Sequence, residues 1–392
     1  MSRGARLWLS ALGVLLPGLA GAQTTLRLVV PATTPATQPI YVAGSFNNWE
    51  PGAAGFALAR QADGSYQLTL PTTVRGTQEF KFTRGSWATG EADAAFQPVA
   101  NRRAEFGASP ATLTLQVVSW QDQRPGGAAL PGPKPHTLAA NVHILSDSFR
   151  LPQLGGRRRR VWLYLPPGYA TARLKRYPVL YLQDGQNVFD EATSFSGEWG
   201  IDETLNQLAA NKSAPECIVV AIDNGGEHRL DEYSPWVNAE YKKGGEGDQY
   251  SNFLALTLKP YVDAHYRTQP DAAHTAVAGS SMGGLIALYA GLKYPLLFGR
   301  IGVFSPAIWF AKDSILAYER RQPAPRASRF YFVAGPGESE TMVPLMNEVR
   351  NGLLARGVSA SHIGYTTPAD GKHAEWFWRR EFGPAYRWLL AR

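Results

Sequence analysis

Two regions of the chain differ in the spacing of their hydrophobic residues. From Thr24 to about Gln121, hydrophobic and polar residues alternate in short runs, and helical spacing is absent. The Asp63-Gly64 pair between two of these runs is typical of a β-hairpin. The pattern predicts a small all-β sandwich of immunoglobulin type over residues 23–121. The alternating runs are TLRLVV, PIYVAGSF, FALARQADGSYQLTL, TQEFKFTRGSW and ATLTLQVVSW.

The second region, residues 138–392, alternates short hydrophobic runs with amphipathic helical stretches. This alternation is typical of βαβ units and predicts a doubly wound, mainly parallel sheet. In such a sheet, active-site residues and ligands are expected at the carboxyl ends of the strands. A segment rich in Pro and Gly, residues 122–137, is predicted to link the two regions. The predicted strands are VWLYLPP, PVLYLQDG, CIVVAIDN, TAVAGSS, RIGVFSP, RFYFVAG and HIGYTT.

The first 22 residues have the features of a cleaved leader. Arg3 and Arg6 precede an apolar run that ends at Ala20-Gly21-Ala22, the small-x-small pattern that signal peptidases cut. The apolar run is too short to span a bilayer comfortably. We therefore predict a signal peptide over residues 1–22, export to the periplasm or the medium, and no membrane span in the mature chain.

The net charge argues against nucleic-acid binding, and the cysteine count excludes an intramolecular disulfide. Loss of Arg3 and Arg6 with the leader lowers the formal net charge from +7 to +5, a mild basic balance. The densest basic run, Arg157 to Arg160, leads into a predicted strand without a second basic cluster or an aromatic platform beside it. We therefore expect no nucleic-acid partner. Cys217 is the only cysteine, so no intramolecular disulfide can form and the hydrophobic cores must stabilise the protein.

The first candidate for a catalytic residue lies in the stretch HTAVAGSSMGG, where two serines are adjacent. Only Ser281 matches the pattern glycine, any residue, serine, any residue, glycine, because Gly279 and Gly283 flank it. A small apolar strand precedes this pattern and a helical run follows it, as a nucleophile elbow requires. Ser281 is therefore predicted to be a nucleophile, and Ser280 a residue of the turn.

A serine hydroxyl needs a base to remove its proton, and the chain has seven histidines. In α/β-hydrolases the base comes last along the chain, which leaves His362 and His373. His362 stands at the start of a predicted strand, whereas His373 lies in the loop after that strand. The loop at a strand's carboxyl end favours His373 as the base.

The acid that orients the histidine is expected on a loop after an intermediate strand. The strand RFYFVAG is followed by PGESE, which offers Glu338 and Glu340. Glu338 is preferred because it lies closer to the strand's end. Glu340 could instead begin the next helix, where a carboxylate interacts favourably with the helix dipole. Asp370, on the loop of the histidine itself, is a third candidate.

Two backbone amides are predicted to donate hydrogen bonds to the developing oxyanion. One belongs to Met282, directly after the nucleophile. The other belongs to Gln186, after the strand PVLYLQ, where Gly185 would allow the backbone to turn inward. Asp184 and Asp223 follow predicted strands, but no cluster of histidines or carboxylates has the spacing of metal ligands. We therefore expect neither a metal nor a cofactor.

These residues are part of a longer series of motifs that resembles the putative esterase family of α/β-hydrolases, over nearly all of residues 138–392. That family includes feruloyl esterases, enterochelin esterases, S-formylglutathione hydrolases and mycolyl transferases. The resemblance implies an α/β-hydrolase fold and an acyl-enzyme mechanism, with Ser281, Glu338 and His373 as the triad and Gln186 and Met282 as the oxyanion donors. Many members carry aspartate where this chain has Glu338. The motifs are RVWLYLPPGY, YPVLYLQDGQNVFD, EWGIDETL, RLDEYSPW, LKPYVDAHYRT, GSSMGGLIALYAGLKYP and FSPAIWF.

The first region resembles the starch- and glycogen-binding sandwich modules, through YVAGSFNNWEP, Asp63-Gly64, EFKFTRGSW and ANR. The resemblance implies that Trp49, Lys81, Trp87 and Asn101 contact sugar, because flat aromatic faces stack on apolar sugar faces and polar groups bind hydroxyls. The same residues could equally be core and turn residues. The expected partners are a small-molecule or sugar-linked ester and a polysaccharide such as a glucan.

The sequence is compatible with three functional hypotheses. The leading one is an exported serine esterase, held near a polysaccharide by its first region. The second is a glycan-binding protein with a vestigial hydrolase domain, and the third is a siderophore lactone esterase or an acyltransferase that uses the same triad. Four tryptophans in or beside the predicted active-site loops suggest a pocket for a planar or sugar-like group, although several could be core. They are Trp199, Trp236, Trp309 and Trp376.

Overall fold

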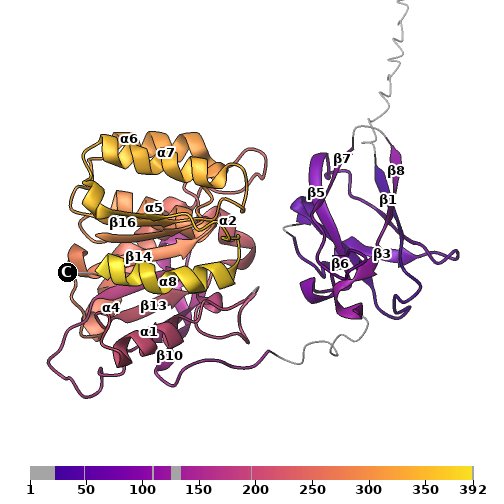
Figure 1. Ribbon diagram of the computed structural model, residues 1–392. Helices are drawn as coiled ribbons and strands as arrows, with labels where there is room; N and C mark the ends of the chain where they lie inside the picture. Colours follow the sequence, from indigo (N-terminus) through magenta and orange to yellow (C-terminus); the bar gives the residue numbers. More distant parts are fainter. Residues whose placement is uncertain (1–22, 48, 108–109, 125–133, 196, 391–392) are drawn as a thin grey trace, which may run out of the picture. The chain divides into compact units, whose positions relative to one another are not determined.

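The computed structural model describes residues 23–47, 49–107, 110–124, 134–195 and 197–390. The chain divides into two compact units, Met1–Gly132 and Pro133–Arg392 (Figure 1). The predicted signal peptide and most of the predicted linker lie outside the described residues. Within the described ranges, no helix is long and apolar enough to cross a membrane.

The first unit is rich in β-strands. Seven strands form a sheet in the order β7-β5-β2-β3-β4-β1-β8, and two short strands, β6 and β9, pair separately. Leu26 and Leu28 of β1 are fully buried while Arg27 between them is half-buried, so the alternating pattern builds the core. The Asp63-Gly64 pair connects β3 to β4, which run antiparallel. The strands are β1 (Thr24–Val29), β2 (Ile40–Gly44), β3 (Ala57–Arg60), β4 (Tyr66–Thr69), β5 (Gly76–Thr83), β6 (Glu91–Ala92), β7 (Arg102–Phe106), β8 (Ala111–Gln116) and β9 (Ser119–Trp120).

The second unit contains an eight-stranded sheet in the order β10-β11-β13-β12-β14-β15-β16-β17. The last six strands in this order are parallel to one another. Strand β11 runs antiparallel to both of its neighbours, β10 and β13. The mainly parallel sheet predicted from the sequence is confirmed, and with its helices it forms an α/β-hydrolase-like fold. The strands are β10 (Val142–Leu151), β11 (Arg157–Tyr164), β12 (Val179–Gln183), β13 (Ile218–Ile222), β14 (Thr275–Ser280), β15 (Arg300–Phe304), β16 (Arg329–Val333) and β17 (Ile363–Thr366).

Helices cover both faces of this sheet, with α5 and α7 on one side and α1 and α8 on the other (Figure 1). Because both faces are covered, the central strands are continuously hydrophobic; every residue of β13 is fully buried. The helices are α1 (Ile201–Ala210), α2 (Arg229–Glu232), α3 (Gly247–Phe253), α4 (Lys259–His265), α5 (Met282–Lys293), α6 (Lys312–Arg321), α7 (Met342–Ala355) and α8 (Glu375–Leu390).

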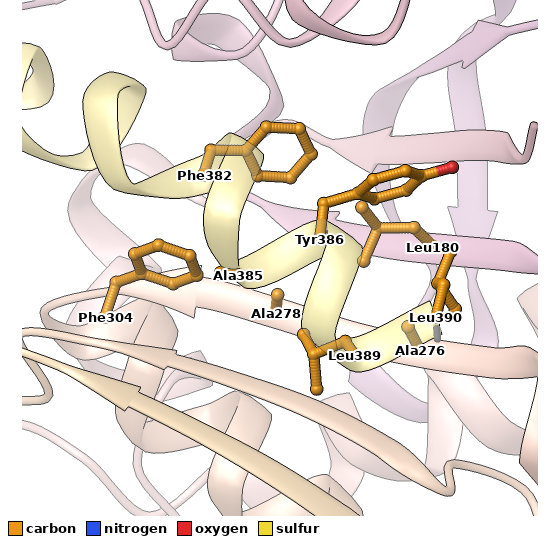
Figure 2. Close-up of a pocket in the computed structure, with 9 residues that line it drawn as sticks. All are labelled: Leu180, Ala276, Ala278, Phe304, Phe382, Ala385, Tyr386, Leu389 and Leu390. Atoms are coloured by element: carbon orange, nitrogen blue, oxygen red, sulfur yellow. The ribbon is translucent and has the colours of Figure 1, made fainter. Parts of the chain in front are cut away.

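Helix α8 packs on the sheet through large side chains that face small ones. Figure 2 shows Phe382, Tyr386 and Leu389 of the helix beside Ala276 and Ala278 of β14. The void that these side chains leave is about 10 Å³ and wholly apolar. A space of that size holds about one water molecule at most and is therefore a packing defect and not a ligand site.

Candidate active site

The carboxyl ends of β12, β13 and β14 meet at a pocket of about 750 Å³. In the sheet β12 lies between β13 and β14, although both follow it in the chain, so the strand order reverses at this point. Such a reversal opens a crevice at the carboxyl ends of the strands, where ligands bind in open α/β sheets. The pocket is lined by Asp184, Gln186, Asn187, Thr193, Ser194, Phe195, Asp223, Asn224, Gly226, Arg229, Ser280, Ser281, His373, Glu375 and Trp378.

Ser281 occupies the sharp turn between β14 and α5. Its backbone has φ 56° and ψ −122°, a conformation that a residue with a side chain adopts only under strain. Two hydrogen bonds of 3.0 Å hold it: the Ser281 amide donates to the carbonyl of Phe304, and the Ala307 amide donates to the carbonyl of Ser281. This is the backbone geometry of a nucleophile elbow, which lifts the hydroxyl above the sheet.

The glycines that flank Ser281 are required by close backbone contacts. A Cβ at Gly279 would lie 2.7 Å from the carbonyl carbon of Gly283. A Cβ at Gly283 would lie 3.1 Å from both Gln183 Cβ and Asp184 Oδ2. The strand end, the start of α5 and the loop after β12 can therefore approach one another only because both positions lack a side chain.

His373 and Glu338 are joined by a hydrogen bond of 2.7 Å between Nδ1 and Oε2. The other carboxylate oxygen, Oε1, accepts from the Gly335 amide at 2.6 Å and from the Ser305 hydroxyl at 2.8 Å. The side chain of Glu338 is fully buried, so these three donors replace its hydration. With Nδ1 held by Glu338, Nε2 is the ring nitrogen of His373 that remains for proton transfer in the pocket, which Ser281 also lines.

The other candidates for the base and the acid lie elsewhere. His362 contacts the carbonyl of Arg326 at 3.0 Å through Nδ1. Asp370 accepts from Arg380 at 3.0 Å, and this hydrogen bond lowers the pKa of Asp370. Glu340 is exposed at the surface. Of the three acids considered, the structure places Glu338 on the histidine.

The predicted oxyanion donors lie at the two loops beside Ser281. Met282 is the first residue of α5, and an amide at this position has no acceptor within its own helix. Gln186 lies in the turn after β12; its side chain accepts from the Asn224 amide at 3.2 Å and its carbonyl accepts from Thr193 at 2.8 Å. A Cβ at Gly185 would lie 2.8 Å from the carbonyl carbon of Ile222, so glycine allows this turn to pack against β13.

Two residues of this site, Ser305 and Trp378, were missed in the sequence. The indole Nε1 of Trp378 donates to the Ser305 hydroxyl at 2.8 Å, and the same hydroxyl donates to Glu338. The ring of Trp378 also packs edge-on against His373, with centroids 5.1 Å apart. The motif FSPAIWF contains this serine, but a serine before proline is a common turn signal and indicates no contact with an acid 33 residues away.

Of the four tryptophans that suggested a pocket for a planar or sugar-like group, with core packing as the alternative, none lines this pocket; they are Trp199, Trp236, Trp309 and Trp376. Trp199 is buried and packs against Phe304 and Trp378, which makes it a core residue behind the pocket. Trp236 packs against Tyr289 and Tyr318, and Trp309 against Tyr241 and Phe310. The tryptophan that the pocket does contain, Trp378, lies on α8 two residues after Trp376.

Asp184 and Arg229 form a two-fold ion pair in the pocket, with distances of 2.7 and 2.9 Å. Asn224 also donates to Asp184, at 2.7 Å. Burial opposes the charge of Arg229, but the adjacent Asp184 carboxylate raises the pKa of this guanidinium above its usual value. Asp223 accepts from the indole of Trp162 at 2.8 Å, and burial raises its pKa. Both aspartates are therefore occupied by protein partners.

The predicted sugar contacts lie in the first unit. Trp49 and Trp87 are neighbours, with ring centroids 6.1 Å apart and a 43° angle between the planes. Lys81 lies on β5, and burial lowers the pKa of its ammonium group. Asn101 is exposed and its amide donates to Glu79 at 3.0 Å. The structure thus brings the two tryptophans together, whereas the side-chain amide of Asn101 is hydrogen-bonded to Glu79.

Comparison with known proteins identifies relatives for both units. Protein YbbA of Bacillus subtilis, which is uncharacterized, is 26% identical over 60% of this chain and 93% of its own length. An iron(III) enterobactin esterase of Dickeya dadantii is 28% identical over 67% of this chain and 57% of that protein. An alpha-amylase of Niallia circulans is 39% identical over 99 residues, which are 25% of this chain and 8% of that enzyme. The chain thus spans only part of the last two relatives.

Solved structures give the same fold. The enterobactin esterase of Shigella flexneri, crystallised in the presence of enterobactin, aligns over 90% of this chain and 88% of its own with a TM-score of 0.52 and 19% identity. At that level of identity the likeness concerns the fold alone. The model of the family described as Putative esterase matches residues 153–389, more than half of the chain. The chain therefore belongs to the putative esterase family and is a carboxylic ester hydrolase.

Proposed function

We propose that the second unit is an exported serine esterase that cleaves its substrate through an acyl-enzyme, with Ser281, His373 and Glu338 as the triad. The observation that supports this most is the 2.7 Å hydrogen bond between His373 and the buried Glu338, beside a pocket that Ser281 also lines. The strained turn at Ser281 supports the nucleophile, since strain of this kind persists where the surrounding structure enforces it.

Each residue has a defined step. Ser281 Oγ attacks the ester carbonyl carbon while His373 Nε2 takes the hydroxyl proton, and the Glu338 carboxylate stabilises the imidazolium. The amides of Met282 and Gln186 donate to the negatively charged oxygen of the tetrahedral intermediate. The intermediate collapses with loss of the alcohol, which receives the proton from His373. Water, activated by the same histidine, then releases the carboxylic acid and regenerates Ser281.

Covalent labelling tests this assignment directly. Diisopropyl fluorophosphate should phosphorylate Ser281 with loss of fluoride, and fragmentation of the peptide by mass spectrometry should place the added group on Ser281 and not on Ser280. In His373→Gln, labelling should slow by at least about 100-fold, because the general base is lost. An enzyme that hydrolyses esters but carries no label on Ser281 after complete inactivation would refute the proposal.

The acyl and alcohol groups of the substrate are not specified by the triad. The relatives named above include an enterobactin esterase, and an endo-1,4-beta-xylanase/feruloyl esterase of Xylanibacter ruminicola is 27% identical over 57% of this chain and 28% of that enzyme. A panel of feruloyl, acetylated-sugar, simple acyl and triscatecholate esters, each assayed with and without an added alcohol acceptor, separates these substrates and separates hydrolysis from acyl transfer.

The leader-like sequence pattern of residues 1–22 supports export, and features of the first unit support a second proposed function, binding of a glucan. We propose a sandwich of immunoglobulin type over residues 23–121, a linker over residues 122–137 and the esterase over residues 138–392. The neighbouring rings of Trp49 and Trp87 and the identity with an alpha-amylase favour sugar binding. Two aromatic faces in one place offer a stacking surface for a glucan.

Trp49→Ala should weaken retention on insoluble starch about tenfold or more, because truncation of a central aromatic removes much of the binding energy of such a site. A pull-down over a range of starch concentrations measures this. Trp376→Ala, which removes a partly exposed tryptophan of the second unit, should leave retention unchanged. Lack of retention of the wild-type protein on starch, glycogen and other glycans would refute glucan binding.

A further inference from the structure

Three carboxyl groups converge beside the active-site pocket, at the start of α1. They belong to Glu198, Asp202 and Glu203, and one oxygen atom from each lies within 4.8 Å of the others. Oxygen ligands of Ca²⁺ lie about 2.3–2.6 Å from the ion, so two ligands on opposite sides of it are separated by about 5 Å. Three oxygens at these separations can therefore contact one ion.

One oxygen of each carboxylate in this cluster is buried without a hydrogen-bond partner. Asp202 is fully buried and only 2% of the Glu198 side chain is exposed, whereas 41% of the Glu203 side chain is exposed. Within the part of the chain that the structure describes, Oε1 of Glu198, Oδ1 of Asp202 and Oε2 of Glu203 accept no hydrogen bond. Buried polar atoms are nearly always satisfied in folded proteins, so three unsatisfied carboxylate oxygens in one place indicate a missing partner.

Protein groups already contact the other oxygens of the same carboxylates. The Ala139 amide donates to Asp202 Oδ2 at 2.8 Å. The guanidinium of Arg379 lies 3.5 Å from Glu198 Oε2 and 3.8 Å from Glu203 Oε1. These contacts orient the three side chains, and the unsatisfied oxygen of each carboxylate remains on the other side.

The charges of the cluster do not balance. Three ionised carboxylates carry −3 and Arg379 contributes +1, which leaves −2 at a cluster in which two of the three acidic side chains are buried. The contacts described around the cluster therefore supply too little positive charge for three ionised carboxylates.

We propose that Glu198, Asp202 and Glu203 bind one divalent metal ion, and that this ion is Ca²⁺. A set of carboxylate oxygens without nitrogen or sulfur suits hard cations such as Ca²⁺, Mg²⁺ and Mn²⁺. Mg²⁺ keeps several of its waters when it binds, whereas Ca²⁺ accepts many protein oxygens in flexible geometry, so three protein carboxylates, two of them buried, favour Ca²⁺. A charge of +2 also neutralises the cluster.

The sequence predicted no metal, whereas we propose a metal site here, because a turn of the backbone brings the three carboxylates together. Glu198 precedes α1, whereas Asp202 and Glu203 are in the first turn of the helix. Gly200, with φ 57°, reverses the chain between them. A Cβ at Gly200 would collide with the guanidinium of Arg379, so glycine here also admits this guanidinium beside the cluster. Sequence spacing alone therefore does not resemble a ligand motif.

A bound ion would stabilise one wall of the pocket. Trp199, between the ligands, packs against Phe304 and Trp378 with ring centroids 5.1 and 5.8 Å away, and Trp378 contacts His373. The segment before Glu198 contributes Thr193 and Ser194 to the pocket lining. The ion would thus tie this segment to α1 and to the core beneath the histidine, without entering the reaction itself.

Calorimetric titration of the full chain tests the site. Protein stripped with EDTA and dialysed should bind one equivalent of Ca²⁺, and CaCl2 at about 100 times the dissociation constant should raise Tm by about 5 to 10 °C. Asp202→Asn removes a ligand charge but keeps the size of the side chain and an oxygen for the Ala139 amide. This variant should bind Ca²⁺ at least tenfold more weakly, as should Glu203→Gln, which guards against misfolding of the first variant.

Asp313→Asn is the matched control. Asp313 is the second residue of α6, as Asp202 is of α1, but it is exposed, so its loss should leave Ca²⁺ binding unchanged. Absence of heat and of a Tm shift in the wild type with CaCl2, MgCl2 and MnCl2 would overturn the proposal, and so would unchanged Ca²⁺ binding in both cluster variants. The measurement needs no substrate, so its result does not depend on the role of Ser281.

Discussion

Ser281→Ala is expected to lower kcat for hydrolysis of nitrophenyl acetate by about 10⁴-fold or more, because no other group can form the acyl-enzyme. The loss should be in kcat, since the hydroxyl contributes little to binding of the ester before attack. Release of nitrophenol, followed by absorbance with purified proteins at saturating ester, measures it. The remaining rate would come from the oxyanion donors and from binding alone.

Ser280→Ala is the matched control for this experiment. The two serines are adjacent and both line the pocket, but Ser280 ends β14 and is buried, whereas Ser281 has the strained conformation of the elbow. We expect kcat of Ser280→Ala to stay near the wild-type value. Equal activity of Ser281→Ala and wild type, or an equal loss in both variants, would show that Ser281 is not the nucleophile.

Glu338→Gln should lower kcat for the same ester by about 10³- to 10⁴-fold. The amide keeps the shape of the side chain but can donate a proton to Nδ1 of His373, which favours the wrong tautomer, and it cannot stabilise the imidazolium. The buried Oε1 accepts two hydrogen bonds, from Gly335 and Ser305, that an uncharged oxygen accepts more weakly. Initial rates at saturating ester, with Tm measured in parallel, separate this effect from loss of folding.

Two acids on the neighbouring segments serve as controls for Glu338. Glu340→Gln changes an exposed side chain two residues away, and Asp370→Asn breaks a surface ion pair with Arg380. Both variants should retain kcat near that of the wild type. A large loss of kcat in Asp370→Asn with little loss in Glu338→Gln would reverse the assignment of the acid.

Local patterns in the sequence predicted much of the fold. The continuous hydrophobic run of β13 indicates a strand covered on both faces, and the structure confirms this parallel sheet. The glycines around Ser281 predict the elbow because a tight turn depends on residues that are neighbours in the chain. The motif series predicted the esterase family, and the family model confirms it.

Contacts between distant residues could not be predicted in this way. The hydrogen bond from Trp378 to Ser305 joins residues 73 positions apart, and the one from Ser305 to Glu338 joins residues 33 apart. No periodicity records such pairs, because they form only when α8 and the loops after β15 and β16 pack at one edge of the sheet. The four tryptophans illustrate the same limit, since an aromatic residue near a loop in sequence can face the core, as Trp199 does, or the solvent, as Trp309 and Trp376 do.

The sequence by itself therefore determined the two regions, the parallel sheet, the family and the serine whose glycine neighbours permit the elbow, because each of these depends on local spacing or on the order of motifs. Tertiary structure decided which of three acids contacts His373, which tryptophan supports it, and that Glu198 meets Asp202 and Glu203. These contacts form only when separate helices, strands and loops pack together. The same packing buries charged side chains, which then need a partner of opposite charge or a hydrogen-bond donor.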